Sequence, residues 1–208
     1  YEISLGLVGS EMCIRDSNKI EWVAGIVNGT TNYILSEMKD NDLSFDTALK
    51  QAQDLGFAEA DPTFDIEGVD AAHKITIMAS IAFGIPINFD AVFIEGINGL
   101  DQKDISYAEE LGYRIKLLAL AKLEERGVEV RVHPTLIPES RLVANVSGPM
   151  NAVLVKGNMV GPTLYYGAGA GAEPTASAVV ADIIDIARQS QISNKPFIPS
   201  LGFMSVSY

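Results

Sequence analysis

Cysteine is nearly missing from this chain: Cys13 is the single one among 208 residues. One cysteine excludes an internal disulfide and any metal site built from several thiolates. Histidine is almost as rare, and His73 and His133 do not have the spacing of a metal-ligand pair. We therefore predict no metal site and expect a reducing compartment, the cytoplasm.

Long apolar runs and an excess of positive charge are also missing. The longest apolar run, 75–87, contains Thr76, Ser80, Gly84 and Pro86, so it is too short and too interrupted to cross a membrane. The N-terminus lacks a basic stretch followed by an apolar one, which is the pattern of a secretory signal. The net charge of -12 disfavours binding to nucleic acid, because phosphate backbones repel an acidic surface.

The chain is 48% hydrophobic, which is typical of a packed globular domain. Residues 1–17 show neither helical nor strand periodicity and resemble a translated sequencing adapter, so we predict that they are a non-native leader. The hydrophobic periodicity of the remainder predicts helices followed by strands and a final helix, an α+β fold with a largely antiparallel sheet. Helices are expected over 28–39, 44–55, 66–83, 104–111 and 174–189, and strands over 21–27, 113–123, 128–132, 142–146, 152–156 and 159–166. Asn28 or Thr30 is expected to cap the first helix and Ser44 the second. A tight turn at Gly157-Asn158 is expected to join the last two strands.

The densest polar cluster surrounds the start of the third expected helix, and it allows two interpretations. In the first, it is a solvated helix start with an Asp70–Lys74 ion pair one turn apart. In the second, the helix is buried, because its second half, 75–83, is apolar nearly all round. Its charged half would then face a cleft suited to a small zwitterion. The cluster consists of Glu59, Asp61, Asp65, Glu67, Asp70, His73 and Lys74.

A glycine-rich stretch, 167–172, lies between an expected strand and the final helix. It matches G-x-G-x-x-A, the pattern of a dinucleotide-binding turn. Glu173, however, would occupy the helix start where a pyrophosphate binds, and no further strand with an acid for the ribose follows. We favour a flexible loop that allows close backbone approach over a complete fingerprint.

Three segments together resemble homoserine dehydrogenase. They occur in that family's order, and the resemblance covers Asn18 to Pro199. The middle segment is long and specific. The segments are GIVNGTTNYIL at 25–35, GFAEADPTFDIEGVDAAHK at 56–74 and GAGAGAEPTASAVVAD at 167–182.

The resemblance implies the NAD(P)-dependent interconversion of L-homoserine and L-aspartate 4-semialdehyde, on the route to threonine, methionine and isoleucine. It implies a homodimer formed through the strands between Tyr113 and Tyr166. It assigns catalysis to Asp70 and Lys74, substrate binding to Glu59, Asp65, Gly29 and Thr30, and the nicotinamide side to Gly169, Gly171, Pro174 and Thr175.

The sequence also departs from the family. The family's N-terminal Rossmann domain is missing here. The family's upstream active-site lysine and its loop that binds a monovalent cation are missing too. We therefore expect 18–208 to be a catalytic (substrate-binding and dimerisation) domain truncated at both ends. NAD(P) would be bound mainly by the absent domain, and the chain alone would be inactive. Two alternatives stay open: a non-catalytic amino-acid-binding or dimerisation module, and the substrate domain of another dehydrogenase, against which the 59–74 segment argues.

Overall fold

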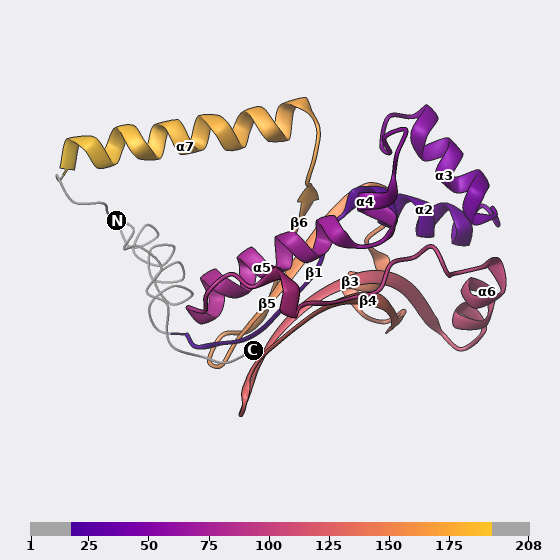
Figure 1. Cartoon of the computed structure of the whole chain (residues 1–208), viewed down its shortest axis with the longest axis horizontal. Helices are drawn as coiled ribbons and strands as arrows, with labels where there is room; N and C mark the ends of the chain where they lie inside the picture. The colour runs from indigo at the N-terminus through magenta and orange to yellow at the C-terminus, as the bar shows by residue number, and fades with distance from the viewer. Residues whose placement is uncertain (1–17, 193–208) are drawn as a thin grey trace.

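A computed structural model describes residues 18–192, with side chains described up to residue 188. The predicted leader, 1–17, lies outside the described residues. A six-stranded sheet in the order β2-β4-β3-β1-β5-β6 is the centre of the fold (Figure 1). Its neighbouring strands are antiparallel except for the parallel pair β2–β4, so the prediction of an α+β fold with a largely antiparallel sheet is confirmed. The strands are β1 (Ile20–Ile26), β2 (Phe93–Ile94), β3 (Tyr113–Glu124), β4 (Gly127–Pro138), β5 (Met150–Gly157) and β6 (Gly161–Ala168).

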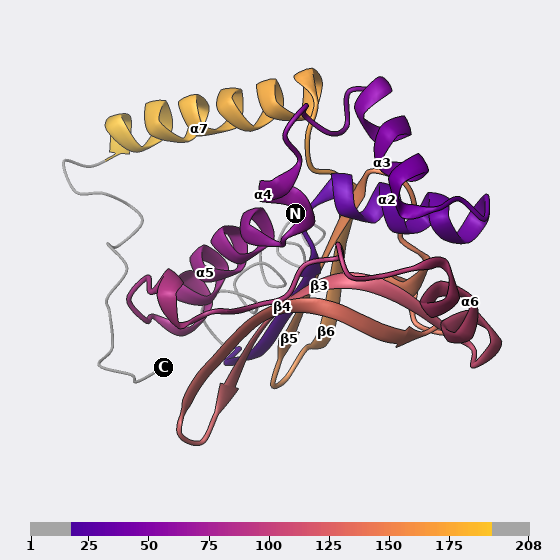
Figure 2. The same ribbon diagram turned by 45° about the vertical axis from the view of Figure 1, so that its right-hand side comes forward.

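Helices cover one face of this sheet, as the turned view in Figure 2 shows. Side-chain caps mark the starts of the helices over 29–40, 45–54 and 102–110: Asn28 Oδ1 accepts from the Thr31 amide, Ser44 Oγ accepts from the Thr47 amide, and Asp101 forms a capping box. The helices are α2 (Gly29–Asp40), α3 (Phe45–Asp54), α4 (Thr63–Ile66), α5 (Val69–Phe83), α6 (Gln102–Glu110) and α7 (Ala172–Ile192), with short 3-10 helices η2 (Phe89–Ala91) and η3 (Leu142–Asn145).

The main core lies between the sheet and the helices α2 and α5. On α5 the sheet-facing residues Ala71, Ala72, Ile75 and Ala79 are fully buried or nearly so. Small alanines on that face let the helix axis approach the strands, and Ile75 fills the remaining space. On α2 the buried Ile34 and Met38 belong to the same core. This packing fixes where the first turns of α2 and α5 meet.

The long helix expected over 66–83 is wrong at its start. Gly68 has a φ of 82°, which ends α4 and separates it from α5. A glycine adopts this left-handed conformation without steric cost. The segment that follows β2 packs against the junction between α4 and α5, where the Ile97 amide donates to the Ile66 carbonyl at 2.7 Å. The expectation that 75–83 is buried all round is also wrong, because Ile77 and Ile81 are 50% and 62% exposed.

Two further expectations are corrected. Residues 142–146 form no strand; the 3-10 helix η3 occupies most of this stretch. Asn145 Nδ2 donates to the carbonyls of Glu139 and Arg141 at 2.9 and 3.0 Å, and such local bonds compete with strand pairing. The hairpin between β5 and β6 turns over the three residues 158–160 rather than tightly at Gly157-Asn158.

The last helix, α7, begins at Ala172 and leaves the sheet at the end of β6 (Figures 1 and 2). Its apolar residues are exposed, among them Val179, Val180 and Ile183. Between residues 18 and 192, no helix combines the length and apolar character that crossing a membrane requires.

Candidate active site

Asn28 joins two carboxylates at the point where β1 ends and α2 begins. Its Nδ2 donates to Asp65 Oδ1 at 2.6 Å and to Asp70 Oδ2 at 2.9 Å. Its Oδ1 accepts from the Thr31 amide at 2.9 Å, as the cap of α2. The cap orients the amide: because the oxygen faces the helix, the NH₂ group faces both carboxylates. Sequence analysis left Asn28 and Thr30 open as the cap, of which Asn28 is the one observed, and it missed the contacts of Asn28 with Asp65 and Asp70.

Lys74 completes this cluster one helical turn beyond Asp70. Its Nζ donates to Asp70 Oδ2 at 2.8 Å and to the Val27 carbonyl at 2.9 Å. The side chain of Lys74 is 48% exposed and that of Asp70 is 21% exposed. An ammonium has three donors, so Lys74 can keep both contacts and still donate to a ligand oxygen. The cluster is partly open to solvent.

The arrangement suits a small molecule that carries both an ammonium and an oxygen. Asp65 and Asp70 supply negative charge for the ammonium. Lys74 supplies a hydrogen-bond donor and a titratable group for the oxygen. Asn28 holds the two carboxylates from β1–α2 while Asp70 and Lys74 come from α5, so relative placement depends on packing rather than on one flexible loop.

The start of α2 lies beside this cluster. Thr30 Oγ1 donates to the Phe57 carbonyl at 2.6 Å, which ties α2 to the loop before α4. Gly29 lies against a neighbouring segment so closely that a Cβ there would come within 2.8 Å of the Pro149 carbonyl oxygen. Glu59 lies in the same loop as Phe57 with an exposed side chain, and its carbonyl accepts from Gln53 Nε2 at 3.1 Å.

The other polar residues of the predicted cluster lie elsewhere. Glu67 is exposed at the break before α5, and therefore does not share a helical stripe with Asp70 and Lys74. His73 stacks between the rings of Phe64 and Phe89, with centroid distances of 5.6 and 4.1 Å. Asp61 Oδ1 accepts from the Thr63 hydroxyl and also from the Thr63 amide, and these hydrogen bonds lower the pKa of the Asp61 carboxyl below its ordinary value. Among the described residues, no group of His, Cys, Asp and Glu could hold a metal ion.

The glycine-rich loop connects β6 to α7, as its strand-and-helix context predicted. Gly169 follows β6, and Gly171 has a φ of 120° directly before the helix. Pro174 is the third residue of α7, and the Thr175 amide donates to the Gly171 carbonyl at 3.1 Å. A Cβ on Gly169 would overlap the side chain of Asn151 on β5, so the absence of a side chain permits a close approach.

A buried hydrogen-bond network holds the segment 146–150 against α2. Asn32 Nδ2 donates to the carbonyls of Val146, Gly148 and Met150, at 3.1, 2.8 and 3.1 Å. The Gly148 amide donates to Ser36 Oγ at 3.1 Å, one helical turn further along. Sequence analysis gave no role to Asn32, because nothing local indicates that a polar residue inside a helix will bind carbonyls more than 100 positions away.

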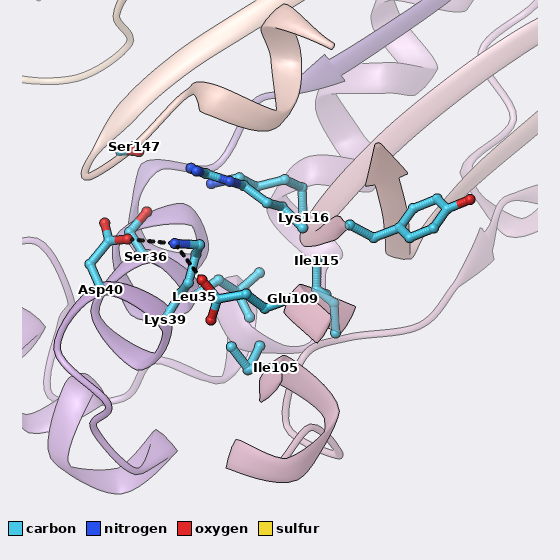
Figure 3. A pocket seen from close by; sticks show the side chains of 11 residues that line it. Leu35, Ser36, Lys39, Asp40, Ile105, Glu109, Ile115, Lys116 and Ser147 are labelled. Atoms are coloured by element: carbon cyan, nitrogen blue, oxygen red, sulfur yellow. Dashed lines mark hydrogen bonds and ion pairs between the residues drawn. The ribbon is translucent and has the colours of Figure 1, made fainter. Parts of the chain in front are cut away.

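Lys116 on β3 completes the network and is only 4% exposed. Its Nζ donates to Asn32 Oδ1 at 2.9 Å and to the Val146 carbonyl at 2.7 Å. Figure 3 shows Lys116 beside a hollow that also contains the ion pairs of Lys39 with Asp40 and Glu109. Burial, with a smaller contribution from the Arg114 guanidinium, lowers the pKa of Lys116 from 10.5 to about 8.

The lowered pKa of Lys116 makes stability depend on pH. The unfolded chain keeps this proton up to about pH 10.5, whereas the folded protein loses it near pH 8. The unfolded state therefore binds more protons between these values, so the free energy of unfolding contributed by Lys116 rises with pH in that window.

We expect the free energy of unfolding of the wild type, relative to Lys116→Met, to increase by about 1–2 kcal/mol between pH 8 and pH 10. Urea denaturation of both proteins at each pH measures it. Because Lys116→Met keeps every other ionisable group, the difference between the two proteins removes the contributions of the tyrosines and the other lysines to the pH dependence. Parallel pH dependences in the two proteins would contradict the assignment.

Known proteins are similar to this chain over most of its length. The family model "Homoserine dehydrogenase" matches residues 11–184. The homoserine dehydrogenase of Neisseria gonorrhoeae is 64% identical over 187 residues, covering 90% of this chain and 43% of that protein. That of Pseudomonas aeruginosa is 59% identical with the same coverage. The crystal structure of a homoserine dehydrogenase from Thiobacillus denitrificans superposes with a TM-score of 0.87 at 62% identity, covering 93% of this chain and 46% of that one. The chain thus spans less than half the length of the curated relatives it matches.

Proposed function

Since the chain belongs to the homoserine dehydrogenase family, we propose that the protein catalyses the NAD(P)-dependent interconversion of L-homoserine and L-aspartate 4-semialdehyde. In a cell this reaction serves threonine, methionine and isoleucine synthesis in the cytoplasm. The single observation that carries the proposal is the cluster in which Asn28 joins Asp65 to Asp70 and Lys74 pairs with Asp70.

The substrate binds between this cluster and the start of α2. Asp65 takes the ammonium of the amino acid, because its Oδ1 is already oriented by Asn28 and its carboxylate is only partly buried. The first turn of α2, at Gly29 and Thr30, faces the substrate carboxylate with its backbone amides, the arrangement that helix N-termini offer to anions. Glu59 contributes from the flanking loop.

Lys74 handles the proton of the reacting oxygen. In the oxidation, Lys74 acts as the neutral amine: it accepts the proton of the substrate hydroxyl, and the O–H electron pair becomes the second carbon–oxygen bond as the carbon loses hydride. In the reduction, the Lys74 ammonium returns that proton to the oxygen. Asp70 positions Lys74 and balances its charge, and the Val27 carbonyl restricts where Nζ can lie.

NAD(P), when bound, supplies the hydride acceptor or donor of the reaction. On this chain, the residues proposed to meet its nicotinamide side are Gly169, Gly171, Pro174 and Thr175. The loop lets Asn151 approach Gly169 closely, because a Cβ there would overlap its side chain, and Gly171 has a backbone conformation that other residues rarely adopt.

The uncovered face of the sheet is proposed to form a homodimer. A groove of 660 Å³ lies on this face, and its apolar lining includes Trp22, Leu118, Leu120, Leu154 and Leu164. A sheet face with this lining gains free energy when it is removed from water. A second copy of the same face, related by a two-fold axis, is the simplest closed assembly.

The activity is tested on the protein expressed from its complete reading frame. We expect NAD(P)H formation, followed by absorbance, to depend on added L-homoserine and to be absent with L-serine, whose hydroxyl is one carbon nearer the ammonium. A folded protein that gives no homoserine-dependent signal with NAD or NADP would overturn the proposal. It would favour the non-catalytic amino-acid-binding or dimerisation module instead.

A further inference from the structure

Asn151 lies at the junction of the two glycine segments of the candidate site. It is the second residue of β5 and pairs in register with Gly167 of β6. Its carboxamide occupies the place that a Cβ on Gly169 would take, and a Cβ on Gly29 would lie 3.7 Å from its Oδ1. The side chain therefore lies between the start of α2 and the loop before α7.

The oxygen of this carboxamide is buried and unsatisfied. Among the residues that the structure describes, Asn151 Oδ1 has no hydrogen-bond partner. A buried carbonyl oxygen without a donor costs about 1–3 kcal/mol, so native proteins rarely keep one without a reason. A ligand that brings an N–H group to this point would remove the cost.

The backbone around Asn151 is held in place from both sides. Asn32 binds the carbonyl of Met150, its preceding residue, at 3.1 Å, and the Pro149 carbonyl packs against Gly29. On the other side Asn151 belongs to the β5–β6 ladder. An acceptor on so constrained a backbone is already oriented before a ligand arrives, which is how specific polar groups in binding sites act.

We propose that Asn151 is a ligand-recognition residue whose Oδ1 accepts a hydrogen bond from an N–H of the bound ligands; this rests on the proposed function. Two N–H groups fit that chemistry. One is the carboxamide of nicotinamide, and the other is the ammonium of homoserine. The unsatisfied Asn151 Oδ1 suits an amide N–H donor, so the residues present fit the cofactor.

Binding rather than turnover tests the proposal, on the protein from its complete reading frame. NADP is titrated calorimetrically, as is its 3-acetylpyridine analogue, which lacks the carboxamide N–H. Homoserine is titrated into protein saturated with NADPH, where no reaction proceeds. The proteins are wild type, Asn151→Ala, Asn151→Asp, and the control Asn158→Ala in the exposed β5–β6 turn. Thermal melts check that each variant is folded.

We expect Asn151→Ala to weaken the binding of one ligand about tenfold. Asn158→Ala should bind both ligands as wild type does. Asn151→Asp keeps an oxygen acceptor of the same size and should restore most of the lost affinity. If the donor is the carboxamide, the wild type prefers NADP to the analogue and Asn151→Ala loses that preference. If it is the ammonium, homoserine binding alone falls, and Asn151→Asp binds homoserine at least as tightly as wild type.

Two results would overturn the inference. In the first, folded Asn151→Ala binds NADP and homoserine as wild type does. In the second, Asn151→Asp is as weak as Asn151→Ala for the affected ligand, because shape rather than an acceptor would then matter. If Asn151→Ala does not fold, Asn151→Asp and the analogue decide in the same way. A wild type that binds neither NADP nor homoserine would instead contradict the proposed function itself.

Discussion

Replacement of Lys74 by alanine is expected to lower turnover about 100-fold or more, the contribution of a positioned acid–base group. Its Nζ is anchored by Asp70 and the Val27 carbonyl, within reach of a ligand oxygen at the cluster. Stability should change by no more than about 1 kcal/mol, because Lys74 is half-exposed and exposed ion pairs contribute little. Steady-state kinetics of homoserine oxidation, with thermal melts alongside, measure both effects.

Two further variants separate proton transfer from charge alone. Lys74→Arg keeps the positive charge but cannot release a proton at workable pH, so it should not restore turnover. Asp70→Asn should also slow turnover, because Asp70 Oδ2 accepts from both Lys74 and Asn28 and thereby positions them. Near-wild-type turnover in Lys74→Ala would return the pair to the simpler interpretation, an ion pair on a solvated helix start.

Substitution of Asn32 by leucine should produce the largest loss of stability, about 3–5 kcal/mol. Leucine has nearly the same size, so the loss comes from hydrogen bonds rather than from a cavity. The Val146, Gly148 and Met150 carbonyls would lose their amide donor, and the buried Lys116 ammonium would lose one of its two acceptors. Urea denaturation at pH 7 measures the free energy of unfolding.

Asn41→Ala is the matched control for Asn32→Leu, because Asn41 lies at the other end of the same helix. Its Nδ2 donates to Glu37 Oε2 on the exposed surface, so water can replace the lost partner. We expect its cost to stay below about 1 kcal/mol. Equal effects of the two substitutions would mean that the buried network around Asn32 does not stabilise the segment 146–150.

The amino-acid sequence by itself determined the local structure and the family. Asn28 or Thr30, and Ser44, predicted the starts of α2 and α3, because capping depends on residues within one turn. Apolar periodicity predicted β1, β3 and β5. It failed for 142–146, where side-chain bonds of Asn145 to nearby carbonyls favour a 3-10 helix, and at Gly68, whose positive φ interrupts an apparently continuous helix.

Only the tertiary structure decided how the chemical groups meet. The sequence shows Asp70 and Lys74 one helical turn apart, but not that Asn28 would reach both Asp65 and Asp70. It gave no indication that Lys116 would be buried against Asn32, or that Asn151 would lie between two glycine segments. The reason is physical: periodicity and caps reflect neighbours within a few residues, whereas these contacts join residues that are at least 37 positions apart in the sequence. They arise only when strands pair and helices pack.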